Sequence, residues 1–97
     1  MGIVVRYNPP GLTAAQYDAG VQRINEELGD AIPDGLEYHV CFGTDGNLLV
    51  SEIWDSREQF EAFGERVLPI LAAAGIDPGR IDIYEVHAVQ NREAARA

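Results

Sequence analysis

The sequence has 97 residues, the length of one small domain, and is too short for a complete doubly wound nucleotide-binding domain or a (β/α)8 barrel. It contains 16 acidic and 7 basic residues, so the formal net charge is −9. This charge argues against a nucleic-acid partner and against an anionic membrane surface, because phosphates would be repelled.

The composition also bears on the compartment. A single cysteine, Cys41, cannot form an intrachain disulfide, which fits a reducing environment. Residues 1–8 lack the basic and long apolar regions of a signal peptide. The longest apolar stretch, residues 67–76, is much shorter than the roughly 20 residues that a membrane span needs. We therefore expect a cytoplasmic protein with no membrane partner.

The first third of the sequence predicts a strand, a helix and a loop. Residues 2–8 are rich in β-branched and aromatic side chains, which is typical of a strand, and the Pro pair that follows ends it. Thr13 and Gln16 can form a capping box, behind which apolar residues recur at helical spacing. We expect this helix to end near Gly29 and residues 31–35 to form a loop.

A β-hairpin is predicted in the middle of the chain. The β-rich runs 36–42 and 48–54 flank a turn that contains the pair Asp45-Gly46, which is typical of two-residue hairpin connections.

The two-residue turn also predicts which residues face each other across the hairpin. His39 lies opposite Glu52, and Glu37 lies opposite Trp54. These four side chains share one face of the hairpin, because successive residues of a strand alternate between its two faces.

The rest of the chain predicts a helix over residues 57–74 and a last strand over residues 80–89. The order β-α-β-β-α-β is typical of a ferredoxin-like α+β fold with a four-stranded antiparallel sheet. We expect residues 1–90 to form a single ferredoxin-like domain and residues 91–97 to form a C-terminal tail.

The second face of the hairpin is almost wholly apolar. Its side chains are Tyr38, Val40, Phe42, Leu49, Ser51 and Ile53. The two helices of this fold cover only one face of the sheet, and a contiguous exposed apolar patch usually marks an interface. We therefore expect a homodimer that packs sheet face against sheet face. The alternative is a monomer with a half-apolar surface.

Residues 50–56, with the sequence VSEIWDS, lead into a helix that carries Glu58, Phe60, Phe63 and Gly64. Together with the strand order, this run resembles the antibiotic biosynthesis monooxygenase-like domains of the dimeric α/β-barrel superfamily. The resemblance covers nearly the whole chain. It implies that two ferredoxin-like protomers pack their sheets into a dimeric α/β barrel, with a small-molecule pocket between the sheet and the helices of each protomer.

The resemblance implies an activity less specifically than it implies a fold. The family includes cofactor-free oxygenases of reduced polyketide aromatics and also heme-degrading enzymes, but the second helix here has no His to ligate iron. We expect a cofactor-independent monooxygenase-like enzyme that acts on an aromatic or polyketide-like small molecule, with no cofactor. The alternatives are a non-catalytic or stress-related small-molecule-binding dimer, and a cyclase or isomerase that uses an acid–base pair.

His39 and Glu52 are the candidate catalytic residues. A carboxylate that bonds to an imidazole fixes its tautomer and stabilises its protonated form. Such a pair can take a proton from a phenol or an activated C–H group, which allows an electron-rich aromatic to pass an electron to O₂. The alternative interpretation is a cross-strand polar pair at the rim of the sheet.

Four further residues are candidates for substrate binding. Trp54 offers a flat face for an aromatic ligand, or it is a core residue that anchors the second helix. Asn8 can hold a substrate oxygen, Tyr17 faces inward from the first helix, and His87 lines either the pocket or the dimer seam. We expect no metal site, because two His and one Cys without close spacing do not make a metal-binding signature.

Overall fold

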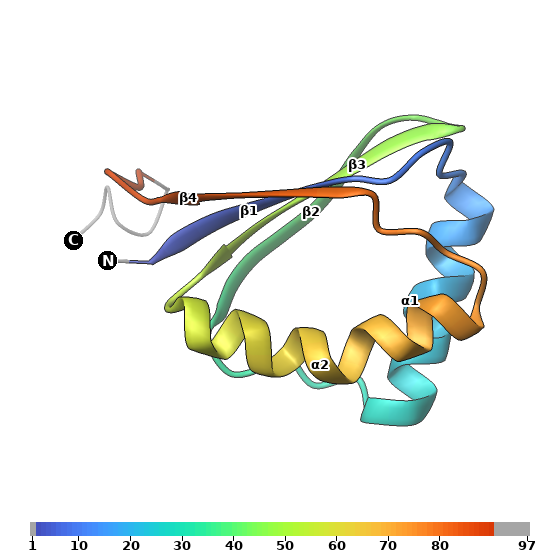
Figure 1. Cartoon of the computed structure of the whole chain (residues 1–97), viewed down its shortest axis with the longest axis horizontal. Coiled ribbons are helices and arrows are strands. Elements are labelled where there is room, and N and C mark those ends of the chain that lie inside the picture. The colour runs from blue at the N-terminus through green and yellow to red at the C-terminus, as the bar shows by residue number, and fades with distance from the viewer. Residues whose placement is uncertain (1, 91–97) are drawn as a thin grey trace.

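The computed structural model describes residues 2–90 of the chain, so the predicted tail at residues 91–97 lies outside the described residues. A four-stranded antiparallel sheet forms one layer, and two helices cover one of its faces (Figure 1). The elements follow the order β1 (Ile3–Asn8), α1 (Ala14–Leu28), β2 (Leu36–Thr44), β3 (Asn47–Trp54), α2 (Arg57–Ala73) and β4 (Arg80–Glu85). The predicted ferredoxin-like α+β fold is therefore confirmed.

The strands lie in the order β2-β3-β1-β4, so β1 is central and pairs with both β3 and β4. Its run of β-branched residues suits a position between two strands, where one face packs against a core. Val5 faces the helices and is fully buried, opposite Glu52 on β3 and Ile83 on β4. The odd-numbered residues of β1 thus point inward.

The predicted register of the hairpin is confirmed from its turn as far as Tyr38, with Thr44 opposite Asn47 and His39 opposite Glu52. The predicted pairing of Glu37 with Trp54 is wrong. A β-bulge at Glu37 places Leu36 opposite Trp54 instead. The extra residue lets Leu36 turn inward and pack against the core, while Glu37 is exposed.

The last strand is shorter than its sequence predicts. β4 ends at Glu85, which pairs with Ile3, the first residue of β1. One more backbone hydrogen bond, from Val86 N–H to the Gly2 carbonyl, closes the ladder. Residues 87–90 find no further partner on β1 and are exposed. The predicted strand over residues 80–89 is therefore wrong in its last four residues.

Both helices begin at the predicted caps. The Thr13 hydroxyl accepts a hydrogen bond from Gln16 N–H, and the Gln16 side chain accepts one from Thr13 N–H, which completes the capping box of α1. Ser56 caps α2 in the same way by accepting from Gln59 N–H. Each cap satisfies a backbone donor that the first helical turn leaves unpaired.

The core lies between the sheet and α2. Its buried cluster consists of Ile3, Val5, Trp54 and Phe60. The Trp54 ring is fully buried and meets the edge of Phe60 at a centroid distance of 5.9 Å. Tilted packing against Phe63 at 5.7 Å completes the aromatic contact between β3 and α2.

Gly79 generates a prediction about the junction between α2 and β4. Its φ is +70°, and a Cβ added there would lie 2.0 Å from the Asn8 carbonyl oxygen at the end of β1. Gly75 has a similar φ of +74°, but an added Cβ would meet no atom within 4 Å.

We expect Gly79→Ala to lower the free energy of unfolding by at least about 2 kcal/mol, because backbone clash adds to left-handed strain. Gly75→Ala is the matched control and should cost only about 1 kcal/mol, the strain alone. Urea denaturation of both variants measures the difference. Equal losses would mean that the close approach of Gly79 to β1 is unimportant for stability.

Candidate functional site

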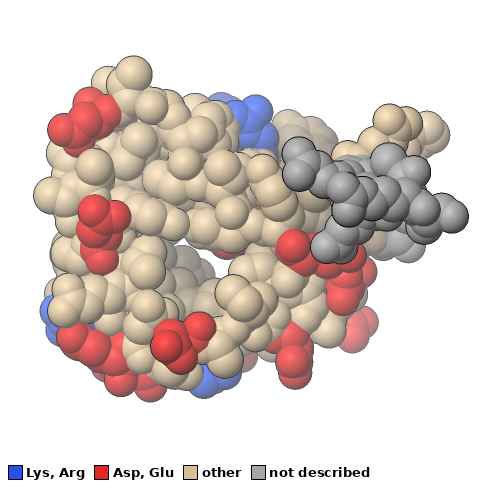
Figure 2. Space-filling model, turned by 180° about the vertical axis from the view of Figure 1, so that it is seen from behind, with Lys and Arg blue, Asp and Glu red and all other residues tan. Residues whose placement is uncertain are grey.

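A cavity of about 290 Å³ lies between the helix-facing side of the sheet and the two helices. Figure 2 shows a hollow between the sheet layer and the helix layer. The walls are mainly apolar and include Val50 and Ile81 from the sheet, Ile24 from α1, and Phe63, Val67 and Leu71 from α2. An apolar cavity with a few converging polar groups is the usual form of a small-molecule site.

Three polar side chains of this cavity form a hydrogen-bonded chain. Tyr17 Oη on α1 lies 2.7 Å from His39 Nε2 on β2. His39 Nδ1 lies 2.6 Å from Glu52 Oε2 on β3. All three residues line the cavity, so the chain runs from its wall into the sheet.

Local structure brings these residues together. The hairpin turn sets His39 opposite Glu52, and the capped start of α1 places Tyr17 over β2, with its ring stacked at 6.1 Å from that of His39. The Glu52 residue is only 6% exposed, whereas the His39 side chain is 35% exposed. The imidazole therefore connects the buried Glu52 carboxylate with the half-buried phenol of Tyr17.

The chemistry of the partners assigns the tautomer of His39. An ionised carboxylate only accepts hydrogen bonds, so His39 Nδ1 carries the proton and donates to Glu52. In the neutral imidazole Nε2 is then an acceptor, and the Tyr17 hydroxyl donates to it. An imidazole with a fixed tautomer thus accepts a hydrogen bond from a tyrosine at the cavity wall.

No protein-family model matches the sequence, and no curated protein matches it. Solved structures do match. SnoaB, a cofactor-independent oxygenase from Streptomyces nogalater, superimposes with a TM-score of 0.61 over 91% of this chain and 93% of its own, at 14% identity. The chain has the antibiotic biosynthesis monooxygenase-like fold.

Two other solved structures share this antibiotic biosynthesis monooxygenase-like fold. A putative antibiotic biosynthesis monooxygenase from Deinococcus radiodurans has a TM-score of 0.59 and 16% identity, over 94% of this chain and 97% of its own. The protein NE2512 of unknown function from Nitrosomonas europaea has a TM-score of 0.60 and 20% identity, over 93% and 91%. Identities this low show the fold alone.

Within this monooxygenase-like fold, Trp54 lies in the core and not in the cavity wall. It is fully buried, and its Nε1–H donates to Glu52 Oε1 at 3.0 Å. The structure therefore places it where the second sequence interpretation put it, as an anchor for α2, and a stacking role for its ring is not supported. Its indole instead holds the second oxygen of the Glu52 carboxylate.

Asn8 and His87 also lie outside the cavity. Asn8 is an even-numbered residue of β1, so it points to the outer face of the sheet, where its Nδ2 donates to Asp82 Oδ2 at 3.3 Å and to the Arg80 carbonyl at 3.2 Å. His87 follows the end of β4 and is exposed. Neither residue lines the cavity, so neither enters the function proposed below.

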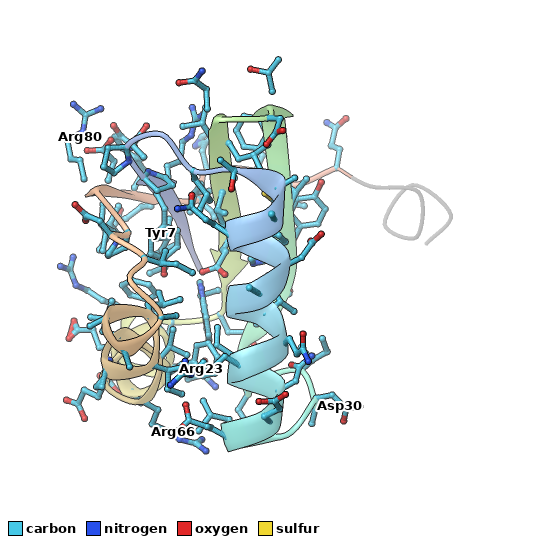
Figure 3. All side chains as sticks on the ribbon, turned by 90° about the vertical axis from the view of Figure 1, so that its right-hand side faces the viewer. Tyr7, Arg23, Asp30, Arg66 and Arg80 are labelled. Atoms are coloured by element: carbon cyan, nitrogen blue, oxygen red, sulfur yellow. The ribbon has the colours of Figure 1, made fainter. Side chains whose placement is uncertain are left out.

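Tyr7 is the cavity residue that sequence reasoning missed. It projects from β1 on the same face as Glu52 and lines the cavity (Figure 3). Burial raises the pKa of its phenol far above the ordinary value, and the nearby Glu52 carboxylate raises it further. The pairing of β1 with β3 is what places Tyr7 beside Glu52, and local sequence patterns do not reveal that pairing.

Burial likewise raises the pKa of Tyr17, with smaller contributions from Cys41, Glu52 and Asp18. The pKa of the Cys41 thiol is raised by burial and by Asp18. Cys41 therefore stays protonated near neutral pH, which disfavours a nucleophilic role. The Tyr17 phenol is neutral there too and can donate its proton.

The described residues contain no group of three or more His, Cys, Asp and Glu side chains that could hold a metal ion. Within residues 2–90, neither helix has the length and apolar character needed to cross a membrane.

The raised pKa of Tyr7 generates a prediction about alkaline stability. The unfolded chain ionises its tyrosine near pH 10.0 while the folded protein keeps Tyr7 neutral, so unfolding releases a proton above that pH. The free energy of unfolding should therefore fall as the pH rises above 10. Urea denaturation between pH 8 and 11 should show a shallower fall in Tyr7→Phe than in the unsubstituted protein. Equal slopes would contradict this account of Tyr7.

Proposed function

We propose that the protein is a cofactor-independent monooxygenase-like enzyme that acts on an aromatic small molecule in the cavity between sheet and helices. The observation that carries this proposal is the bonded chain of Tyr17, His39 and Glu52, which leads from the cavity wall to a buried carboxylate. A chain of this kind can accept a proton from a bound hydroxyl or activated C–H group.

The geometry of the bonded chain supports one path for the proton. The substrate hydroxyl donates to Tyr17 Oη, and the Tyr17 proton passes to His39 Nε2, 2.7 Å away. Because Glu52 accepts from His39 Nδ1, its negative charge stabilises the imidazolium that forms. The raised pKa of Tyr17 suits a carrier that passes a proton on without remaining ionised.

The substrate anion then reacts with O₂ as co-reactant. An electron passes from the anion to O₂, and the two radicals combine at the activated ring carbon. For a phenol with an activated ring C–H group the balance is complete with one O₂. One oxygen atom becomes the second carbonyl of a quinone product, and the other leaves as water with the ring hydrogen and the hydroxyl hydrogen. SnoaB, which shares the fold, is itself a cofactor-independent oxygenase, and this supports the assignment.

Oxygen uptake with an electron-rich phenolic substrate tests the proposal. We expect His39→Gln to lower the rate by about 10²–10⁴-fold, the usual contribution of a general base. Tyr17→Phe and Glu52→Gln should also lower it, because each breaks one bond of the chain. Cys41→Ser is the matched control and should change the rate far less, since Cys41 lies on the same strand but does not line the cavity or bond to the chain.

Two outcomes would favour the alternatives. Turnover that depends on His39 but continues under argon would indicate a cyclase or isomerase. Tight binding with no turnover, unchanged in His39→Gln, would indicate a non-catalytic small-molecule-binding protein. Full oxygen uptake by the His39→Gln variant would exclude the proposed base.

We also infer that the protein forms a homodimer through the outer face of its sheet. No helix among the described residues covers this face (Figure 1). Tyr38 and Tyr84 on this face are 53% and 59% exposed, and Val40, Phe42 and Ile53 are only partly buried. Covering this apolar surface with a second copy would stabilise a small chain, which by itself buries only about 60–65% of the surface that its unfolded form exposes.

A charged substitution on the sheet face tests the dimer. Ile53→Arg should convert a dimer into a monomer, because the new charge would be buried without a partner. Ile32→Arg is the control, since Ile32 lies in a loop and is already 73% exposed. Native mass spectrometry should show twice the chain mass for the unsubstituted protein and for Ile32→Arg. A monomer in all three samples would exclude this interface.

A further inference from the structure

We propose that the cavity takes an uncharged aromatic alcohol of about two fused rings, with its hydroxyl at Tyr17 and with no carboxylate or phosphate group. The placement of the hydroxyl rests on the proposed function. The size rests on the cavity alone, and the lack of charge rests on the cavity walls and on the net charge of the protein.

The charge of the walls excludes anionic ligands. Of the five Arg residues that the structure describes, none lines the cavity. Arg23 and Arg66, which lie on the helices (Figure 3), are exposed at the surface. The one acidic side chain that lines the cavity is the buried Glu52, and its carboxylate would repel a second anion in this low-dielectric space.

The field of the whole protein acts in the same direction. The formal net charge is −9, and acidic side chains outnumber basic ones on the face that Figure 2 shows. An anionic ligand would therefore be disfavoured both on its approach and at its binding site. An uncharged ligand would lose nothing from either effect.

The volume of the cavity limits the size of the ligand. An engineered apolar cavity of about 150 Å³ holds one benzene molecule. The cavity here measures about 290 Å³, which corresponds to two such rings. The enclosed part of the ligand is therefore two fused rings rather than the framework of a four-ring polyketide.

Gly64 on α2 sets this volume. It lines the cavity, and a Cβ added at this position would meet no atom within 4 Å. Glycine in the middle of a helix lowers helix stability, so this position does not serve the helix itself. The missing side chain leaves room for the second ring, and we assign Gly64 as the residue that determines ligand size.

Isothermal titration calorimetry with a matched ligand pair tests the lack of charge. The probes are 6-hydroxy-2-naphthamide and 6-hydroxy-2-naphthoate, which have nearly the same shape and differ in charge. We expect the amide to bind at least tenfold more tightly than the carboxylate. Equal binding of the two, or tighter binding of the carboxylate, would overturn the proposal.

Substitution of Gly64 tests the size and the location together. Gly64→Leu should weaken the binding of 2-naphthol at least tenfold and that of phenol much less. Gly64→Ala is the control and should change 2-naphthol binding less than threefold. A Tm no lower than that of the unsubstituted protein, measured on both variants, establishes that they are folded. Unchanged 2-naphthol binding by folded Gly64→Leu would overturn the assignment.

Oxygen uptake separates this inference from the proposed function. If the amide and 2-naphthol bind as expected but no uncharged phenol consumes O₂, the ligand class stands and the oxygenase proposal fails. If the protein oxidises carboxylated phenols and rejects their amides, the oxygenase proposal stands and the ligand class fails.

Discussion

The burial of the Glu52 carboxylate constrains the rest of the structure. An ionised carboxylate removed from water costs several kcal/mol unless hydrogen-bond donors replace the lost solvent. Here each oxygen has a donor, Trp54 Nε1–H at 3.0 Å and His39 Nδ1 at 2.6 Å. One buried group therefore fixes the orientation of the core indole and the tautomer of the imidazole. The same bonds that stabilise the hairpin leave His39 Nε2 free to face Tyr17.

The cavity exists because the helices approach each other closely at only one end. Gly20 on α1 is buried, and a Cβ there would lie 2.7 Å from Ile76 Cδ1, just beyond α2. Figure 1 shows α1 beside the C-terminal end of α2 only. Towards the middle of α2, at Gly64, no side chain fills the space. Two glycines thus have opposite effects, since Gly20 allows close contact between the two helices and Gly64 preserves a gap.

Local signals in the sequence were sufficient to predict the element order and the central pair of the site. Asp45-Gly46 sets the hairpin register, and that register alone brings His39 opposite Glu52. The capping residues Thr13 and Ser56 likewise act within a few positions of themselves. Features of this kind depend only on residues a few positions away in the sequence.

The features that sequence reasoning missed depend on distant partners. The bulge at Glu37 arises where Leu36 must reach the core, and β4 stops where β1 begins. The alternation of side chains along β1 puts Asn8 and Arg6 on the same face of the strand. It does not show whether that face or the other one packs against the helices. No local pattern singles out Tyr7, because its position beside Glu52 depends on the pairing of β1 with β3. Each of these features depends on contacts between residues that are far apart in the sequence.

The position of Trp54 has an optical consequence. It is the sole tryptophan of the chain, so all indole fluorescence of the protein comes from one site. Its ring is shielded from water, and its N–H is bonded to the carboxylate that also holds His39. Indole emission responds to nearby charge and to the state of that bond. Trp54 and the candidate base His39 both bond to Glu52, so the fluorescence of Trp54 reports on this network without an added label.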